Sequence, residues 1–319
     1  MVPPQNLTIG IAVMTLQSES HLSRCLLPFL NSPLKPRLLV VDSSSTDGTV
    51  AIAKSMGAET FVIPRQEFNH GSSRELARKM LKTDIVVMLT PDAFAVDASV
   101  LEKLVQPILK GLAVVCYARQ IPHEGASFFE AFPREFNYPI NSQLRALTDL
   151  DQYGVYTFFC SDSCAAYLNR ALDEIGGFQP VLFGEDTVAV AKLLHKSYKI
   201  AYVAEALVYH SHRYSLRQEF CRYFDVGLMR QQYRSLILTK ATDSQRGREF
   251  VRLMFKRLWR EHPSLLPYAC AQTLTKWLGY RMGQWSVKAP VWFKKTLSSQ
   301  RYYWSSTAYI QSTKTHLHS

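Results

Sequence analysis

The sequence lacks the features that would assign it to several special classes of protein. No stretch approaches the roughly 18 consecutive apolar residues that a membrane-spanning helix needs. The amino-terminal residues contain no basic segment followed by an apolar one, so we expect no signal peptide. The six cysteines are scattered and never form a C-x-x-C pair, which argues against a disulfide framework and a zinc site. We therefore expect a cytoplasmic protein with reduced thiols.

The charge of the chain is its most unusual bulk property. Its 319 residues include 37 Lys and Arg but only 26 Asp and Glu, for a net charge of +11. A basic excess favours anionic partners such as nucleic acid, anionic lipid or nucleotide phosphates. From Ser215 onward, Arg and Lys alternate with aromatic residues and leucine, whereas the acids that look placed for chemistry precede that point.

Strands and helices alternate along the first 120 residues. Buried strands are predicted at 7–16, 36–42, 59–64, 84–90 and 112–120, and helices at 18–32, from Thr49, at 72–82 with Ser72 or Ser73 as cap, and at 100–110. This order is typical of an α/β protein with a parallel sheet covered by helices. Beyond it we predict an irregular aromatic-rich segment at 121–156, a strand and a helix in 157–178, a helix from Gly184 and a strand pair in 199–212.

Two predicted strands end on a carboxylate, in "VVDSSSTDGT" and "VVMLTPDAFAVD". Ligands of open α/β sheets bind beyond the carboxyl ends of the strands, so Asp42 and Asp92 are expected to face one crevice. Asp92 lies on a loop after Pro91 and suits Mg²⁺ or Mn²⁺, although it could be only a turn aspartate. Asp42 can accept hydrogen bonds from a base or ribose, and Ser44 lies in the hydroxyl-rich turn that follows.

Three further segments carry candidate site residues. In "FNHGSSRELA", Gly71 lies in a polar loop, and Arg74 could bind diphosphate oxygens or be a solvated helix residue. In "GEDTVAVAKL", Glu185 and Asp186 open a helix, either as caps or with one of them as a general base. In "VYHSH", two histidines share one face of an extended chain and could bind metal or diphosphate, or be structural.

These five segments, in this order, resemble the family 2 glycosyltransferases with a GT-A fold, in particular bacterial rhamnosyltransferases of surface-polysaccharide synthesis. The resemblance covers roughly residues 7–235, and "KWLGYRMGQW" in the tail is also similar to that branch. It implies an α/β fold with a mostly parallel sheet flanked by helices and a helical, basic C-terminal extension. Residues 1–235 would form the catalytic domain and residues 236–319 the extension.

The resemblance also implies a chemistry for the motifs. Asp186 matches the catalytic base, and Asp92 with His210 matches the site of an Mg²⁺ or Mn²⁺ cofactor. The substrate would contact a further set, namely Asp42, Ser44, Gly71, Arg74, Asp162, Glu185 and His212. The sequence departs from the family pattern in reading Thr90-Pro91-Asp92 for Asp-x-Asp, Arg74-Glu75 for Arg-Asn, and Met14-Thr15-Leu16-Gln17 for Pro-Thr-Tyr-Asn.

The implied reaction is an inverting transfer from a dTDP- or UDP-sugar, with dTDP-L-rhamnose as the expected donor. The acceptor would be a glycan or a lipid-linked glycan. One alternative is a catalytically weak protein of the same fold that only binds sugar nucleotides. A nucleic-acid-binding protein is a second alternative, but carboxylates lining a cleft repel a phosphate backbone, so we expect no nucleic acid partner.

The C-terminal part contains amphipathic stretches. In "GREFVRLMFKRLWREHP" one helical face collects apolar residues, namely Phe250, Val251, Met254, Phe255 and Leu258, with basic residues elsewhere. Such a helix could lie on an anionic membrane surface or pack on the catalytic domain. A second stretch repeats the pattern at Leu274, Trp277, Leu278 and Trp285. The sequence thus leaves peripheral membrane binding and internal packing as alternatives.

Overall fold

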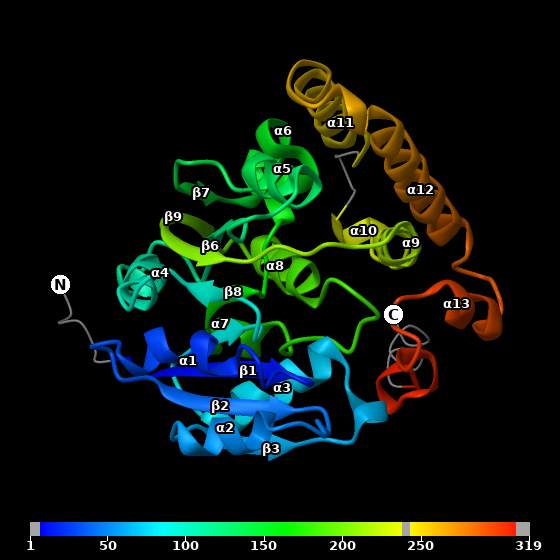
Figure 1. The fold of residues 1–319 in the computed structure, drawn as a ribbon. Coiled ribbons are helices and arrows are strands. Elements are labelled where there is room, and N and C mark those ends of the chain that lie inside the picture. The colour runs from blue at the N-terminus through cyan, green and yellow to red at the C-terminus, as the bar shows by residue number, and fades with distance from the viewer. Residues whose placement is uncertain (1–6, 238–242, 311–319) are drawn as a thin grey trace.

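The structure is a computed structural model that describes residues 7–237 and 243–310. A single nine-stranded sheet runs through its centre, with helices on its faces and a group of C-terminal helices along one edge of the molecule (Figure 1). The strand order is β3-β2-β1-β4-β8-β6-β9-β5, and β7 pairs with β9. The α/β fold expected from the sequence is confirmed.

The amino-terminal half of the sheet is parallel. Its strands are β1 (Ile9–Thr15), β2 (Arg37–Asp42), β3 (Glu59–Val62) and β4 (Ile85–Leu89). The connecting helices are α1 (Leu22–Leu30), α2 (Thr49–Ser55), α3 (His70–Leu81) and, after β4, α4 (Val100–Leu109). Every residue of β1 and β4 is buried, as expected for strands covered on both faces.

The second half of the sheet is mixed. β8 (Cys164–Leu168) runs antiparallel between β4 and β6 (Val115–Ile121), whereas β9 (Ile200–Tyr209) is parallel to β6. Two short strands, β5 (Phe94–Ala95) and β7 (Gln143–Arg145), pair antiparallel with β9. The predicted strand pair at 199–212 is wrong, because β9 is one continuous strand. Its pairing to β6 shifts register at residues 204–206, so the interruption there is a bulge and not a turn.

The segment 121–156 is more regular than predicted. It contains α5 (Phe128–Asn137), which begins in a capping box of Ser127 with Glu130, and the single turn α6 (Leu150–Tyr153). The remaining helices of this half are α7 (Asn169–Glu174) and α8 (Glu185–His195). Short 3₁₀ turns are η1 (Arg65–Glu67), η2 (Leu147–Asp149) and η3 (Gly154–Phe158).

The C-terminal part is helical, as predicted. Its elements are α9 (Leu216–Gln232), α10 (Arg234–Ile237), α11 (Asp243–Glu261), η4 (Pro263–Leu265), α12 (Leu266–Trp285), α13 (Val291–Leu297) and η5 (Tyr303–Ser305). Met254 and Leu258 of α11 are buried against Phe132 of α5. The apolar face of α11 is therefore covered by protein, and the membrane alternative is wrong for that face. Among the described residues, no helix is long and apolar enough to span a membrane.

Candidate functional site

A cluster of one carboxylate and two imidazoles lies at the edge of the sheet. Asp92 follows β4, and His210 and His212 follow β9; the pairing of Phe94 with Tyr209 brings these two strand ends together. The Nε2 atoms of His210 and His212 lie 3.6 Å and 3.5 Å from the two carboxylate oxygens of Asp92. One ligand atom from each residue falls within 4.8 Å of the others, a spacing that could hold a metal ion.

The histidines are oriented for coordination. The Nδ1–H of His210 donates to the amide oxygen of Gln120 at 2.9 Å, which leaves its Nε2 lone pair facing Asp92. The two imidazole rings are nearly perpendicular, with centroids 4.5 Å apart. His210 is buried, whereas Asp92 and His212 remain about one third exposed. The donor set fits a divalent cation that retains open positions for a ligand.

The protonation states of this cluster also suit a cation. Burial opposes the ionisation of Asp92, but at acid pH, where His210 is protonated, the hydrogen bond and charge interaction with His210 outweigh it and hold the pKa of Asp92 well below its usual range. Burial lowers the pKa of His210, and burial together with the neighbouring His210 lowers the pKa of His212 to about 4. Near neutral pH the cluster therefore presents one anionic carboxylate and two neutral imidazoles, the forms that bind metal.

A second cluster is built around a buried arginine. The Nε atom of Arg74 lies 2.9 Å from Asp162, and Nη1 lies 2.6 Å from Glu185. All three side chains are less than a tenth exposed. Burial would lower the pKa of Arg74, but Glu185 and then Asp162 outweigh it and raise the pKa. Arg74 is thus enclosed by protein carboxylates, which favours a positioning role over the direct diphosphate contact predicted for it.

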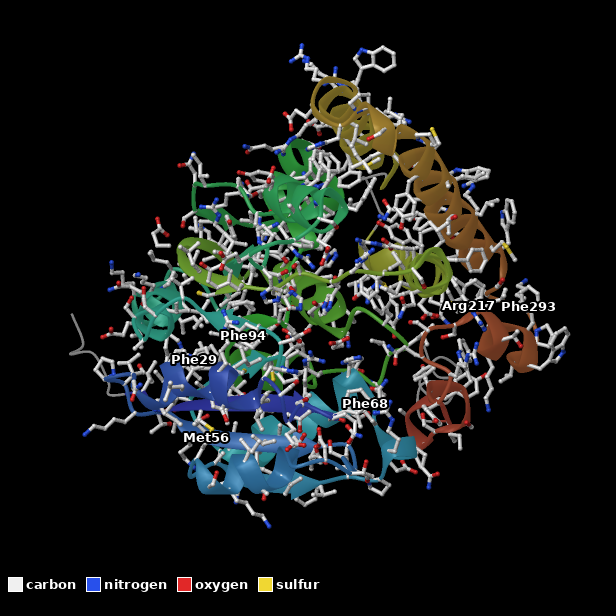
Figure 2. The ribbon with its side chains drawn as sticks, viewed as in Figure 1. Phe29, Met56, Phe68, Phe94, Arg217 and Phe293 are labelled. Carbon is white, nitrogen blue, oxygen red and sulfur yellow. The ribbon has the colours of Figure 1, made fainter. Side chains whose placement is uncertain are left out.

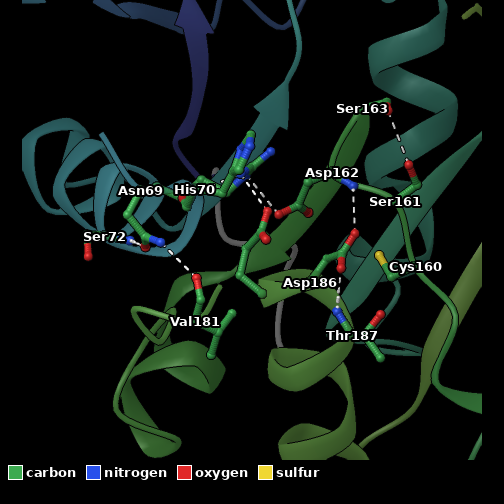
Figure 3. A network of polar contacts seen from close by, with 12 residues as sticks. Asn69, His70, Ser72, Cys160, Ser161, Asp162, Ser163, Val181, Asp186 and Thr187 are labelled. Atoms are coloured by element: carbon green, nitrogen blue, oxygen red, sulfur yellow. Dashed lines mark hydrogen bonds and ion pairs between the residues drawn. The ribbon is translucent and has the colours of Figure 1, made fainter. Parts of the chain in front are cut away.

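Asp186 lies beside this ion-pair cluster (Figure 3). One of its oxygens accepts from Thr187 N at 2.6 Å, and the other lies 3.4 Å from Asp162 N. Burial first, and then the charges of Glu185 and Asp162, raise the pKa of Asp186 to about 8. Burial also raises the pKa of Asp162 to about 6, against the effect of Arg74. One cation among three carboxylates leaves Asp186 as the member that holds a proton most readily.

Asn69 joins the start of α3 to the loop that precedes Asp186. Its Oδ1 accepts from Ser72 N at 3.0 Å, and its Nδ2 donates to Val181 O at 2.7 Å (Figure 3). The helix therefore begins at His70, and the predicted cap at Ser72 or Ser73 is wrong. The physical reason is that Asn69 is extended and its amide serves both as cap and as a tie to the loop.

Two residues of α3, Gly71 and Glu75, also hold the loop that precedes Asp186. A Cβ at Gly71 would stand 1.8 Å from the carbonyl oxygen of Gln179, so only glycine fits at this crossing. Glu75 accepts from Phe178 N at 2.9 Å and pairs with Arg78 at 2.6 Å. Both residues hold the 177–181 segment against α3. The geometry gives Gly71 a packing role, and its predicted substrate contact stays a prediction.

Asp42 and Ser44 lie at the end of β2 and shape the turn there. Asp42 is fully buried, and its carboxylate accepts from Thr15 Oγ1 at 2.9 Å and from the backbone and hydroxyl of Ser45. Ser44 has a left-handed backbone with φ 59°, and its hydroxyl donates to Ile63 O at 2.8 Å. This turn is held from within, and contact with a nucleobase stays a prediction.

Two arginines near the Asp92 cluster escaped the sequence analysis. The charges of Arg134 on α5 and Arg222 on α9 both act to lower the pKa of His210 and of His212, so both guanidinium groups lie within electrostatic reach of the cluster. Arg222 stacks 4.6 Å from the ring centre of Tyr214. No local signal could have revealed them, because each lies within an ordinary amphipathic helix far along the chain from Asp92.

Comparison with known proteins places the chain in a family. The model of glycosyl transferase family 2 matches residues 11–176. The O-antigen chain rhamnosyltransferase RfbN of Salmonella typhimurium is 34% identical over 279 residues, which cover 86% of this chain and 89% of RfbN. Both findings confirm the family resemblance drawn from the sequence.

Solved structures show the same fold at low sequence identity. S. aureus TarS 1-349 in complex with UDP has a TM-score of 0.57 at 14% identity, over 88% of this chain and 91% of that chain. The mannosyltransferase PcManGT from Pyrobaculum calidifontis, in complex with GDP-Man and Mn²⁺, has a TM-score of 0.55 at 14% identity, over 99% of this chain and 82% of that chain. Together with the family match and the relative, these similarities show that the chain is a glycosyltransferase and belongs to glycosyl transferase family 2.

Proposed function

We propose that this enzyme transfers an L-rhamnosyl group from dTDP-L-rhamnose to a hydroxyl of a glycan acceptor, with inversion at the anomeric carbon. The observation that carries the proposal is the pair of clusters: a cation-type cluster at Asp92 and an acid with a raised pKa at Asp186. The first suits the departing diphosphate and the second the attacking hydroxyl. The 34% identity to a rhamnosyltransferase supports rhamnose as the sugar.

The donor would lie across the carboxyl ends of β1, β2 and β4. The turn at Asp42 and Ser44 would contact the nucleoside, and the diphosphate would reach Asp92, His210 and His212. A divalent cation bound there supplies charge stabilisation to the leaving diphosphate. Two imidazoles with one carboxylate favour Mn²⁺ over Mg²⁺, since Mg²⁺ prefers oxygen ligands. Arg134 and Arg222, whose charges act on the same cluster, would bind the remaining phosphate oxygens.

Asp186 would act as the general base. It takes the proton of the acceptor hydroxyl while the oxygen forms a bond to the anomeric carbon. The bond from that carbon to the diphosphate breaks, and the electron pair leaves with the nucleotide. The reaction is a single displacement without a covalent enzyme intermediate. Arg74 would keep Glu185 and Asp162 ionised and fix the start of α8, so it positions Asp186 and does not contact the sugar.

The acceptor in this proposal is a glycan carried on a lipid, and the enzyme would work at the cytoplasmic face of a membrane. The relative RfbN acts in O-antigen chain synthesis according to its name, which supports a polysaccharide acceptor. A peripheral attachment would keep the enzyme near a lipid-linked acceptor.

A donor panel tests the proposal. The purified enzyme is incubated with UDP-, GDP- and dTDP-sugars and with Mn²⁺, Mg²⁺ or EDTA, and release of nucleotide diphosphate is measured. We expect metal-stimulated turnover of dTDP-L-rhamnose above all others, with no turnover in EDTA. Glu124→Gln, which removes an exposed acid, is the control and should behave as wild type. Preference for another donor would refute the rhamnosyl assignment, and tight donor binding without any turnover would support the alternative of a binding protein.

A further inference from the structure

Helix α12 packs closely on α9 through glycine residues of both helices. A Cβ at Gly279 would stand 2.4 Å from Phe220 O, and one at Gly283 would stand 2.1 Å from Phe224 O. On the α9 side, a Cβ at Gly227 would stand 2.1 Å from Tyr280 O. The two backbones therefore touch, and any side chain at these positions would separate the helices. This crossing determines which face of α12 points away from the protein.

The outward face of α12 is apolar and aromatic. Its residues recur at helical spacing opposite the glycines and include Leu274, Trp277 and Leu278, which are 40–55% exposed, and Trp285, which is 72% exposed. Trp259 at the end of α11 and Trp292 on α13 are 74% and 69% exposed. Tryptophans are therefore exposed on three consecutive helices, and large apolar side chains that gather on a surface mark interaction sites. We call these four tryptophans with Leu274 and Leu278 the aromatic face.

The aromatic face lies along the outer edge of the molecule. Helices α11, α12 and α13 follow one another there, on the far side of α9 from the sheet (Figure 1). Phe293 of α13 marks this edge, and Phe29 of α1 lies on the opposite side of the molecule (Figure 2). Helix α9 lies between α12 and the sheet, so the outward face of α12 points away from the sheet (Figure 1).

Charge identifies what this face would bind. Residues 236–319 hold 14 Lys and Arg but three Asp and Glu, whereas residues 1–235 hold 23 of each kind. The whole net charge of +11 therefore belongs to the part of the chain that carries the aromatic face. Exposed basic residues accompany the tryptophans, with Arg252 two turns and Lys256 one turn before Trp259, and Arg281 stacked 5.7 Å from the ring of Trp285.

We propose that the aromatic face is a docking surface for an anionic lipid bilayer. Tryptophan favours the headgroup level of a bilayer, where its ring is buried and its N–H remains hydrated, and nearby Lys and Arg bind anionic headgroups. The proposal rests on the proposed function in one respect, since a lipid-linked acceptor gives a reason for the attachment. Of the two amphipathic stretches expected from the sequence, the proposal assigns lipid contact mainly to the one in α12, because the apolar face of α11 packs on α5.

The docking surface is mechanically close to the candidate base. Helix α9 contacts α12 on one side, and on the other Phe224 and Leu228 pack on Leu182 in the loop before α8. Met229 of the same helix lies against Gly184, two residues before Asp186. A bilayer bound to α12 would therefore hold the acceptor side of the active site at a fixed height above the lipid surface.

Vesicle binding tests the docking surface without donor or acceptor. Full-length enzyme is sedimented with vesicles of phosphatidylglycerol and phosphatidylethanolamine, and with vesicles of phosphatidylcholine alone. We expect binding to the anionic vesicles that weakens steeply with salt, because exposed charges are screened within about 8 Å at physiological ionic strength. The double variants Trp277→Ala/Trp285→Ala and Arg281→Glu/Lys288→Glu should each reduce the partition coefficient about tenfold or more.

Controls separate this result from the other readings. Leu27→Ala removes an apolar side chain of α1 that is 54% exposed, the same fraction as Trp277, and should bind vesicles as wild type does. Turnover of a soluble donor should survive in both double variants, so a failed rhamnosyl assignment leaves the vesicle result interpretable. Equal binding to neutral and anionic vesicles, or no loss in the variants, would overturn the proposal. Sedimentation of the wild type as a dimer that Trp277→Ala/Trp285→Ala dissociates would assign the face to a second copy instead.

Discussion

Two clusters at the same edge of the sheet hold aspartates in opposite states. Asp92 faces two imidazoles, and its pKa is held well below the usual range. Asp186 faces two further carboxylates in a buried setting, and its pKa is raised to about 8. Neighbours, and not residue type, therefore assign one aspartate to hold a cation and the other to exchange a proton.

The largest expected effect breaks the cation-type cluster. Asp92→Ala should abolish turnover that depends on a divalent cation, because the cluster loses its only anionic ligand. The fold should remain intact, since Asp92 lies on a loop beyond β4. Donor hydrolysis with Mn²⁺, together with a thermal melt, measures both. Activity equal to that of the wild type would remove Asp92 from the site.

The next effect concerns the base. Asp186→Asn keeps the size of the side chain but cannot accept a proton, so the transfer rate should fall about 10²–10⁴-fold while donor affinity changes little. Glu185→Gln is the matched control because it changes the adjacent acid. If Glu185→Gln cripples transfer and Asp186→Asn is mild, the base is Glu185. If both are mild, Asp162 is the next candidate.

The pH profile sharpens the contrast further. Since Asp186 must lose its proton to act as base, kcat/KM should rise with pH and level off above about pH 8, falling about tenfold per pH unit below that point. Glu185 raises the pKa of Asp186, so Glu185→Gln should move the midpoint to lower pH. A flat profile between pH 6 and pH 9 would contradict the role of Asp186.

The smallest expected effect is on stability. Asp186 binds its proton more tightly in the folded chain, with a pKa of about 8 against an ordinary 3.8. Its contribution to stability is therefore fully present below about pH 4 and is lost as the pH rises through 8. Asp186→Asn should be more favourable to stability above pH 8 than at pH 6, because asparagine has no carboxylate whose ionisation burial and the neighbouring acids oppose. Chemical denaturation at pH 6 and pH 9 measures the difference, and an equal effect at both would argue against a charge origin.

Local patterns in the sequence predicted most of the fold. Strand ends on Asp42 and near Asp92 followed from runs of buried β-formers that stop at polar turns. α5 was missed because Pro133 and its aromatic residues hide the helical period, and β9 was divided because a bulge in one strand resembles a turn. In both cases tertiary pairing decided the structure, and a local pattern contains no information about that pairing.

Individual residues of the candidate site could be predicted from the sequence, but the contacts between them could not. The Asp92 and His210 pair followed from the family resemblance, whereas His212 was expected on the substrate and lies in the cation-type cluster. The pairing of Arg74 with Asp162 and Glu185 joins residues about 90 to 110 positions apart, so no spacing rule reveals it. Arg74 lies in a buried ion pair, and its expected contact with the substrate stays a prediction.

The uneven charge gives the molecule a large electric dipole moment. A neutral body of 235 residues carries an 84-residue part with all eleven net positive charges. Near a negatively charged plane, such a particle experiences a torque before it makes any contact, and it rotates until its positive end leads. The enzyme would then reach an anionic surface with its positive end already facing that surface. Only its position on the surface, and not its orientation, would remain to be found by diffusion.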